Sequence, residues 1–192
     1  MSNVQLLAAV PALLAGAGLA QAQVVYTDIP DVTIGVSALP RVDVDLDLDG
    51  LHDFSLVSSA NGPSFESLTG TMVAGSNNML LEPNRLNAGD VIDGSISYQA
   101  AAAFPGDVMG TGKWSNGTEG YLGLQFISLE TGQTHYGWAH IATTTNASGI
   151  VDSLTLFDYA YEATPGAAIT AGVVPAPGGL AALALGAGAL AG

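Results

Sequence analysis

The chain has 192 residues, with 17 acidic side chains against 3 lysines and arginines and a formal net charge of −14 at pH 7. Nucleic acids and anionic membranes bind basic surfaces, so this balance argues against both as partners. Because the chain has no cysteine, disulfides and thiolate metal sites are excluded. The length of the chain suits one domain with a full core. Its 25 glycines, with frequent Val, Ile, Thr and Ser, favour short strands and turns.

Residues 1–22 have the pattern of a secretory signal peptide. Residues 6–19 are apolar and small, and Ala20, Gln21 and Ala22 form an A-x-A cleavage site. The first residues carry no lysine or arginine. We therefore expect a secreted protein whose mature chain begins near Gln23.

An acidic segment, DLDLDGLHD, covers residues 45–53. Calcium takes about 6–8 oxygen ligands, and a loop with carboxylates at alternate positions supplies them. Gly50 stands where such a loop turns sharply and where a side chain would be in the way. We predict a Ca²⁺ site formed by the carboxylates of Asp45, Asp47, Asp49 and Asp53 and the backbone carbonyl of Leu51. The pattern D-x-D-x-D-G-x-x-D resembles the short calcium loops of FG-GAP repeats, which join two strands.

The same segment has an alternative interpretation as a solvated acidic strand or turn. Apolar residues alternate with acids from Val42 to Asp49, which is also typical of a half-buried strand. Such a strand would stack like charges about 7 Å apart on one face, and Asp is a poor strand former. A divalent cation removes that conflict, so the calcium loop is the favoured hypothesis.

Short apolar segments separated by turns continue to residue 172. Residues 120–127 and 134–141 flank a glycine-bearing turn and predict a β-hairpin. In a long predicted strand at 150–162, we expect Leu154, Leu156 and Ala160 on one face and Phe157, Tyr159 and Tyr161 on the other. Residues 41–49 lead into the acidic loop. Further expected elements are strands at 24–36, 54–57, 67–74 and 91–98, a helical turn at 100–103 and an edge strand at 169–174.

This succession of short strands, with turns about every 8–12 residues, predicts an all-β fold. We expect a single antiparallel β-sandwich or jelly-roll-like domain over residues 23–172, between short apolar terminal segments. No repeat of about 20–50 residues is visible, which argues against a solenoid or propeller.

Histidines and acids outside the loop give weaker signals. His135 and His140 lie in one predicted strand at positions that face opposite sides of a sheet, so they cannot share one ion. Glu119 and Glu130 could be imagined as a glycosidase pair, but any chain this acidic offers such pairs. No nucleophile-elbow, zinc-protease or phosphate-loop motif accompanies them, so we expect no enzyme.

Aromatic side chains raise the question of sugar binding. Trp114, Tyr121, Tyr136 and Trp138 could stack on saccharide rings, or they could be core and cross-strand residues. Core packing is the favoured interpretation.

The chain ends in a second apolar segment at residues 173–192. Val174, Pro175 and Pro177 precede a run of Leu, Ala and Gly over residues 180–192. This tail resembles that of PEP-CTERM proteins, and segments such as GYLGLQF and HYGWAHI resemble stretches common in that family. Ala176 stands where the family usually has an acid, and the terminal arginine cluster is absent. The resemblance implies processing by an exosortase during export to the outer surface of a Gram-negative bacterium.

Together these features predict an exported, non-enzymatic structural protein of the cell surface or biofilm matrix, stabilised by Ca²⁺. Its uncharged apolar ends add the hypothesis of self-association into filaments, for example by strand addition. The alternative is a carbohydrate-binding module for exopolysaccharide.

Overall fold

The computed structural model describes residues 23–35, 41–59, 62–75, 82–104, 113–114 and 118–175. In these ranges the chain forms strands and turns without a helix, which confirms the predicted all-β class. Accordingly, the described part offers no helix with the length and apolarity to span a membrane. The predicted signal peptide and residues 176–192 of the predicted tail lie outside the described residues.

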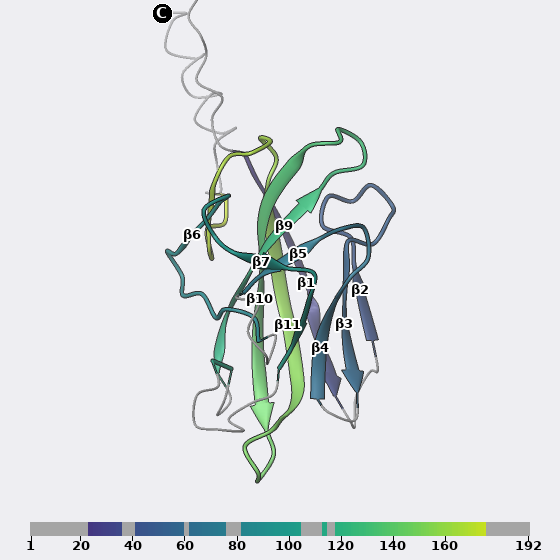
Figure 1. Cartoon of the computed structure of the whole chain (residues 1–192), viewed down its shortest axis with the longest axis vertical. Helices are drawn as coiled ribbons and strands as arrows, with labels where there is room; N and C mark the ends of the chain where they lie inside the picture. Colours follow the sequence, from purple (N-terminus) through teal and green to yellow (C-terminus); the bar gives the residue numbers. More distant parts are fainter. Residues whose placement is uncertain are drawn as a thin grey trace, which may run out of the picture.

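Two antiparallel sheets form the body of the protein, and a short ribbon accompanies them (Figure 1). The larger sheet has the order β1-β11-β10-β9-β5-β7, and the smaller one β2-β3-β4-β8. The larger sheet consists of β1 (Val24–Gly35), β11 (Val151–Glu162), β10 (Thr134–Thr145), β9 (Glu119–Ile127), β5 (Met72–Ala74) and β7 (Tyr98–Gln99). The smaller consists of β2 (Arg41–Val44), β3 (Phe54–Ser59), β4 (Gly62–Ser67) and β8 (Ala101–Ala103), and the ribbon pairs β6 (Val91–Ile92) with β12 (Ile169–Thr170).

The main core lies between the two sheets. Alternate side chains of the larger sheet, such as Leu122, Leu124 and Leu156, share one buried cluster with Phe54 and Phe65 of the smaller sheet. The two phenylalanine rings stack with their centroids 5.1 Å apart. This packing of inward-facing residues from two antiparallel sheets confirms the predicted sandwich.

A second apolar cluster covers the outer face of the larger sheet. Trp138 of β10 is 1 % exposed and packs in a cluster with Ile92 of β6 and Ile169 of β12. Figure 1 shows β6 on the opposite side of the larger sheet from β2, β3 and β4. Strand β10 is therefore buried on both faces.

The predicted hairpin is present as β9 and β10, which pair antiparallel along their length. The prediction for β11 is right as far as Phe157, which packs on His140 away from the main core, and wrong beyond it. Asp158 pairs with His140 of β10, and Leu156 pairs with Ile141, which directly follows His140. Phe157 is therefore an extra residue in β11. This bulge shifts the alternation by one position. As a result, Tyr159 and Tyr161 join the main core side, and Ala160 lies in the second cluster.

Other predicted elements differ from the structure in length or type. The strand expected at 67–74 is only β5, because residues 68–70 bend and Gly70 has φ +85°. The strand expected at 91–98 is interrupted where the Asp93 carboxylate accepts the Ser95 backbone N–H at 2.8 Å. The helical turn expected at 100–103 is strand β8, whose Ala102 is 3 % exposed in the core. The last strand is only β12.

Candidate metal centre in the loop between β2 and β3

The acidic segment is a loop that joins two paired strands. Val44 and Phe54 are opposite each other at the ends of β2 and β3, and the Asp53 backbone N–H donates to the Val44 carbonyl at 2.8 Å. Leu46 is fully buried, whereas Leu48 is 66 % exposed, so the strand-like alternation ends at Leu46. The acidic strand is therefore excluded, and the segment is a loop between two strands, which both the calcium loop and the solvated turn require.

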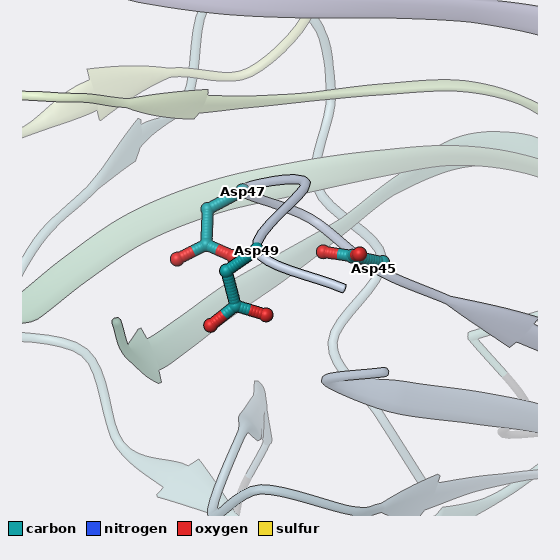
Figure 2. A group of neighbouring side chains, drawn as sticks. All are labelled: Asp45, Asp47 and Asp49. Atoms are coloured by element: carbon teal, nitrogen blue, oxygen red, sulfur yellow. The ribbon is translucent and has the colours of Figure 1, made fainter. Parts of the chain in front are cut away.

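Three predicted ligands lie together in this loop. Asp45, Asp47 and Asp49 each offer a carboxylate oxygen, and these atoms all lie within 4.8 Å of one another. Figure 2 shows the Asp45 carboxylate pointing toward those of Asp47 and Asp49. Like charges at this separation repel, and a cation between the three carboxylates would relieve that repulsion.

Hydrogen bonds within the loop hold part of this cluster in place. One Asp45 oxygen accepts the Gly50 N–H at 2.9 Å, and one Asp49 oxygen accepts the Leu51 N–H at 2.8 Å. By contrast, Oδ1 of Asp45 and Oδ1 of Asp47 are buried without a hydrogen-bond partner. A buried carboxylate oxygen without a partner is costly, so these two atoms are the ones that a cation would satisfy.

Asp53 supports the loop from the protein side. Its side chain is 4 % exposed, Oδ2 accepts the Leu46 N–H at 2.7 Å, and Oδ1 accepts the Thr69 hydroxyl at 3.0 Å. Burial raises the pKa of Asp53 to about 6, and the nearby charges of Asp47 and Asp45 add to the rise. Asp53 is not one of the carboxylates that gather within 4.8 Å, so its direct coordination of an ion stays a prediction.

Gly50 and Leu48 give the loop its sharp turns. Gly50 has φ +91°, which favours glycine, yet a Cβ added there would meet no atom within 4 Å. The need for glycine therefore comes from backbone conformation, and the expectation that a side chain would be in the way is wrong. Leu48 also has a positive φ, of 60°, without being glycine. The carbonyl of Leu51 as a ligand stays a prediction.

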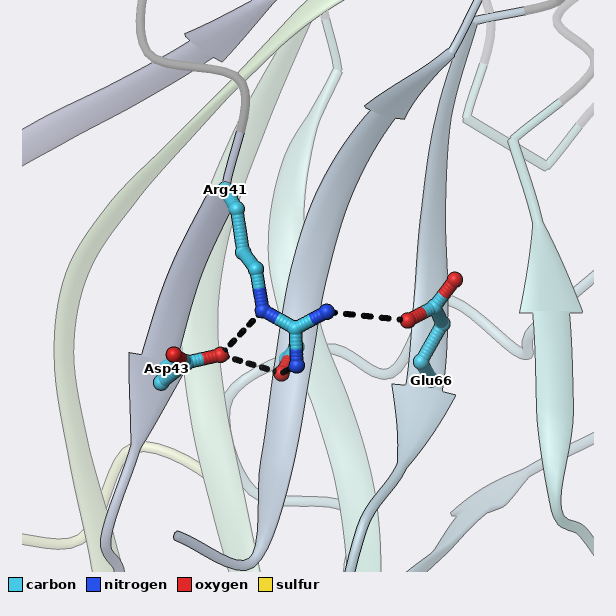
Figure 3. Close-up of polar contacts among 4 residues, drawn as sticks. Arg41, Asp43 and Glu66 are labelled. Atoms are coloured by element: carbon cyan, nitrogen blue, oxygen red, sulfur yellow. Dashed lines mark hydrogen bonds and ion pairs between the residues drawn. The ribbon is translucent and has the colours of Figure 1, made fainter.

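Asp43 precedes the cluster in sequence but has a separate role. Its carboxylate accepts hydrogen bonds from the Ser55 hydroxyl and from the Arg41 guanidinium, and these partners hold its pKa below the usual range. Arg41 also reaches Glu66 at 3.3 Å (Figure 3). The guanidinium thus links β2, β3 and β4 on the outer face of the smaller sheet.

The histidines and tryptophans considered as candidates lie outside the cluster of Asp45, Asp47 and Asp49. His135 is buried in the main core and His140 lies on the other face of β10, which confirms that they cannot share an ion. His52 is exposed within the loop. Trp114 is fully buried and Trp138 is 1 % exposed, so neither ring offers a surface on which a saccharide could stack.

Comparison with known proteins gives no relative for this chain. No protein-family model, no characterised protein and no solved structure matches it.

Proposed function

We propose that this protein is an exported, non-enzymatic structural protein of the bacterial cell surface or matrix, and that Ca²⁺ stabilises its fold at residues 45–53. The observation that carries the proposal is the gathering of Asp45, Asp47 and Asp49 within 4.8 Å. Two of their buried oxygens lack a partner, so an ion there would meet an existing need.

Calcium suits this loop better than other common divalent ions. The donors are carboxylate and carbonyl oxygens, which hard cations prefer. Mg²⁺ demands near-ideal octahedral geometry, whereas Ca²⁺ accepts irregular oxygen sets in flexible loops. Extracellular calcium modules bind with Kd values of about 0.1–1 mM, and we expect this range for the loop.

An ion in this loop would stabilise contacts between the two sheets. The Asp45 carbonyl accepts the Tyr159 hydroxyl of β11 at 3.3 Å. The Asp53 side chain connects the loop to Thr69, which follows β4. Because these contacts reach both sheets, fixing the loop with a cation is expected to stiffen the whole sandwich. That is a structural role and needs no catalytic group.

The first prediction concerns the dependence of stability on Ca²⁺. At ten times Kd, binding to the folded state alone stabilises by about 1.4 kcal/mol, which corresponds to a rise in Tm of roughly 3–6 °C. We expect this rise in the wild type, its loss in EDTA, and at least about a tenfold weaker Kd in Asp47→Asn. Calorimetric titration and thermal melts measure both quantities.

The matched control for this prediction is Glu119→Gln, which removes the same charge from a 63 % exposed side chain in β9 that contacts His140 and does not line the loop. It should leave the affinity for Ca²⁺ within about twofold of the wild type, because long-range surface charges are screened. An identical melt in EDTA and in Ca²⁺ would remove the calcium site from the proposal.

Export is tested separately from calcium binding. Fractionation of cells that produce the full chain should place the protein outside the cytoplasm. Its intact mass should show loss of residues 1–22. Retention of those residues in a cytoplasmic fraction would contradict the proposed location and leave the calcium test intact.

A further inference from the structure

A small pocket of about 160 Å³ is lined by Asp47 and otherwise by residues that have no part in the proposed calcium loop. It brings the hairpin turn between β9 and β10 together with β10, β11 and the acidic loop. The side chains that can bind a ligand there belong to Asp47, Glu130, His135 and Tyr161, with Ser128 and Thr131 beside them.

His135 is the unusual member of this pocket. Its side chain is 3 % exposed, and its Nδ1 lies 2.8 Å from the Glu162 backbone carbonyl. A carbonyl only accepts, so Nδ1 must carry the hydrogen, and in the neutral ring Nε2 then carries a lone pair. Nε2 is buried and has no hydrogen-bond partner.

The ring is also held rigidly. It stacks on Phe126 with the centroids 5.5 Å apart and meets Tyr161 edge-on at 6.1 Å. A histidine whose Nδ1–H is fixed by a backbone carbonyl and whose Nε2 is free is the usual arrangement of a metal ligand. Burial raises the pKa of Tyr161, and the charges of Asp47 and Glu130 add to this, which places both carboxylates near the same pocket.

We propose that this pocket binds a second divalent cation, a borderline transition metal such as Zn²⁺, through His135 Nε2 and the carboxylates of Asp47 and Glu130. An imidazole nitrogen suits Zn²⁺, whereas Ca²⁺ prefers oxygen. In the structure these three donors do not all lie within 4.8 Å of one another. Glu130 lines the pocket from the exposed hairpin turn, and the proposed coordination requires its side chain to move toward the other two donors.

The test is a calorimetric titration of Zn²⁺ into the folded protein at saturating Ca²⁺. His135→Gln and Glu130→Gln should each weaken Zn²⁺ binding at least about tenfold. His52→Gln and His140→Gln, at the other two histidines, should change it less than about twofold. Cu²⁺ in place of Zn²⁺ should give an electron paramagnetic resonance spectrum with coupling to one nitrogen, which is lost in His135→Gln.

Two results separate this site from the calcium loop. Asp49→Asn should weaken Ca²⁺ binding and leave Zn²⁺ binding unchanged, because Asp49 does not line the pocket. If His135→Gln fails to fold, Glu130→Gln decides, since that side chain lies in an exposed turn. Zn²⁺ binding that is unchanged in Glu130→Gln, or that is lost in His52→Gln, overturns the proposal.

A separate observation concerns Glu162 at the end of β11. Its side chain is fully buried, and Oε1 accepts the backbone N–H groups of Gln23 and Thr164, both at 2.8 Å. Its Oε2 is buried without a hydrogen-bond partner, and none of the ion pairs among the described residues includes Glu162. A buried carboxylate without a counter-charge is unfavourable.

We infer that removal of the predicted signal peptide, residues 1–22, supplies this counter-charge. The inference rests on the proposed export. A host peptidase adds water across the bond between Ala22 and Gln23, which leaves a carboxylate on Ala22 and an amine on Gln23. That amine takes a proton, and its nitrogen is the atom already 2.8 Å from Glu162 Oε1. The new ammonium has further N–H groups for Oε2, so processing locks β1 onto β11.

Mass and amino-terminal analysis of the exported protein should give a free amine on Gln23. The chain that starts at Gln23 should melt roughly 5–10 °C higher than the same chain with Ala22 retained. Glu162→Gln should lower Tm only in the chain that starts at Gln23. The proposed ion pair is contradicted by cleavage at another bond, by cyclisation of Gln23, or by equal melting temperatures of the two chains. None of these results contradicts export.

Discussion

At the scale of single residues, Asp53 shows how much the loop depends on one buried carboxylate. Both of its oxygens are used by the protein, one by the Leu46 backbone and one by Thr69. The acids at 45, 47 and 49 could be predicted from their spacing, because a loop motif is local. The bracing role of Asp53 could not, because Thr69 is brought to it by the fold and no sequence pattern links the two.

The second prediction concerns pH and follows from Asp53. Its pKa in the folded protein is about 6, above the value of 3.8 for an ordinary Asp. The folded state therefore binds this proton more tightly than the unfolded state does. The resulting stabilisation is fully present below pH 3.8 and is lost as the pH rises through about 6. In EDTA, we expect Asp53 to lower the free energy of unfolding between pH 4.5 and 7 by about 1–2 kcal/mol.

Urea unfolding in EDTA at several pH values measures this change, and Asp53→Asn is the control because it cannot ionise. The contribution of Asp53 is the difference in pH dependence between the two proteins. Ca²⁺ favours ionised carboxylates nearby, so it should reduce that difference. Equal pH dependence of wild type and Asp53→Asn in EDTA would contradict the raised pKa.

At the scale of strands, the fold is predictable where the pattern and the pairing are both local. The β9–β10 hairpin satisfies this condition, because its two strands are joined directly and pair antiparallel without a register shift. Strand β11 does not satisfy it, since the bulge at Phe157 exists only relative to its partners. Likewise, the alanines of β8 form a strand because β4 pairs with them, which overrides their helix propensity.

The third prediction tests the packing of β10 against β11. A Cβ added at Gly137 would lie 2.7 Å from the Ala160 carbonyl oxygen and 3.3 Å from the Tyr161 side chain. Gly137→Ala must therefore push two paired strands apart, at a cost of about 1–3 kcal/mol in the free energy of unfolding. Urea denaturation measures the loss. Unchanged stability would show that the pairing is looser than the structure describes.

Gly132→Ala is the companion variant in the hairpin turn. Gly132 has φ +66°, and a Cβ there would meet nothing within 4 Å. Only the backbone conformation opposes the substitution, so we expect a cost of about 1 kcal/mol. The two variants thus separate the effect of close strand approach from that of a left-handed turn.

At the scale of the whole molecule, the sheet edges bear on the filament hypothesis. The long edge strand β1 carries Pro30 and a register shift between Asp28 and Val32, and both acids, Asp28 and Asp31, are exposed. The other edge strands, β2, β7 and β8, have 4, 2 and 3 residues. Proline, charge, bulges and short length all discourage strand addition. Filament formation would therefore need more than the edges of the described sandwich.

The fourth prediction separates binding of an ion at the loop from general screening of charge. The net charge of −14 with only 3 lysines and arginines makes the folded protein repel itself, and salt weakens that repulsion over a Debye length of about 10 Å at 0.1 M. In EDTA, NaCl should therefore raise Tm of the wild type and of Asp47→Asn alike. Ca²⁺ at matched ionic strength should add a further rise in the wild type, and this extra rise should be lost in Asp47→Asn.

Mg²⁺ is the control for divalent charge, because it screens as Ca²⁺ does but fits an irregular oxygen loop poorly. An equal rise with Mg²⁺ and Ca²⁺ in both proteins would mean that the acids act only through their summed charge.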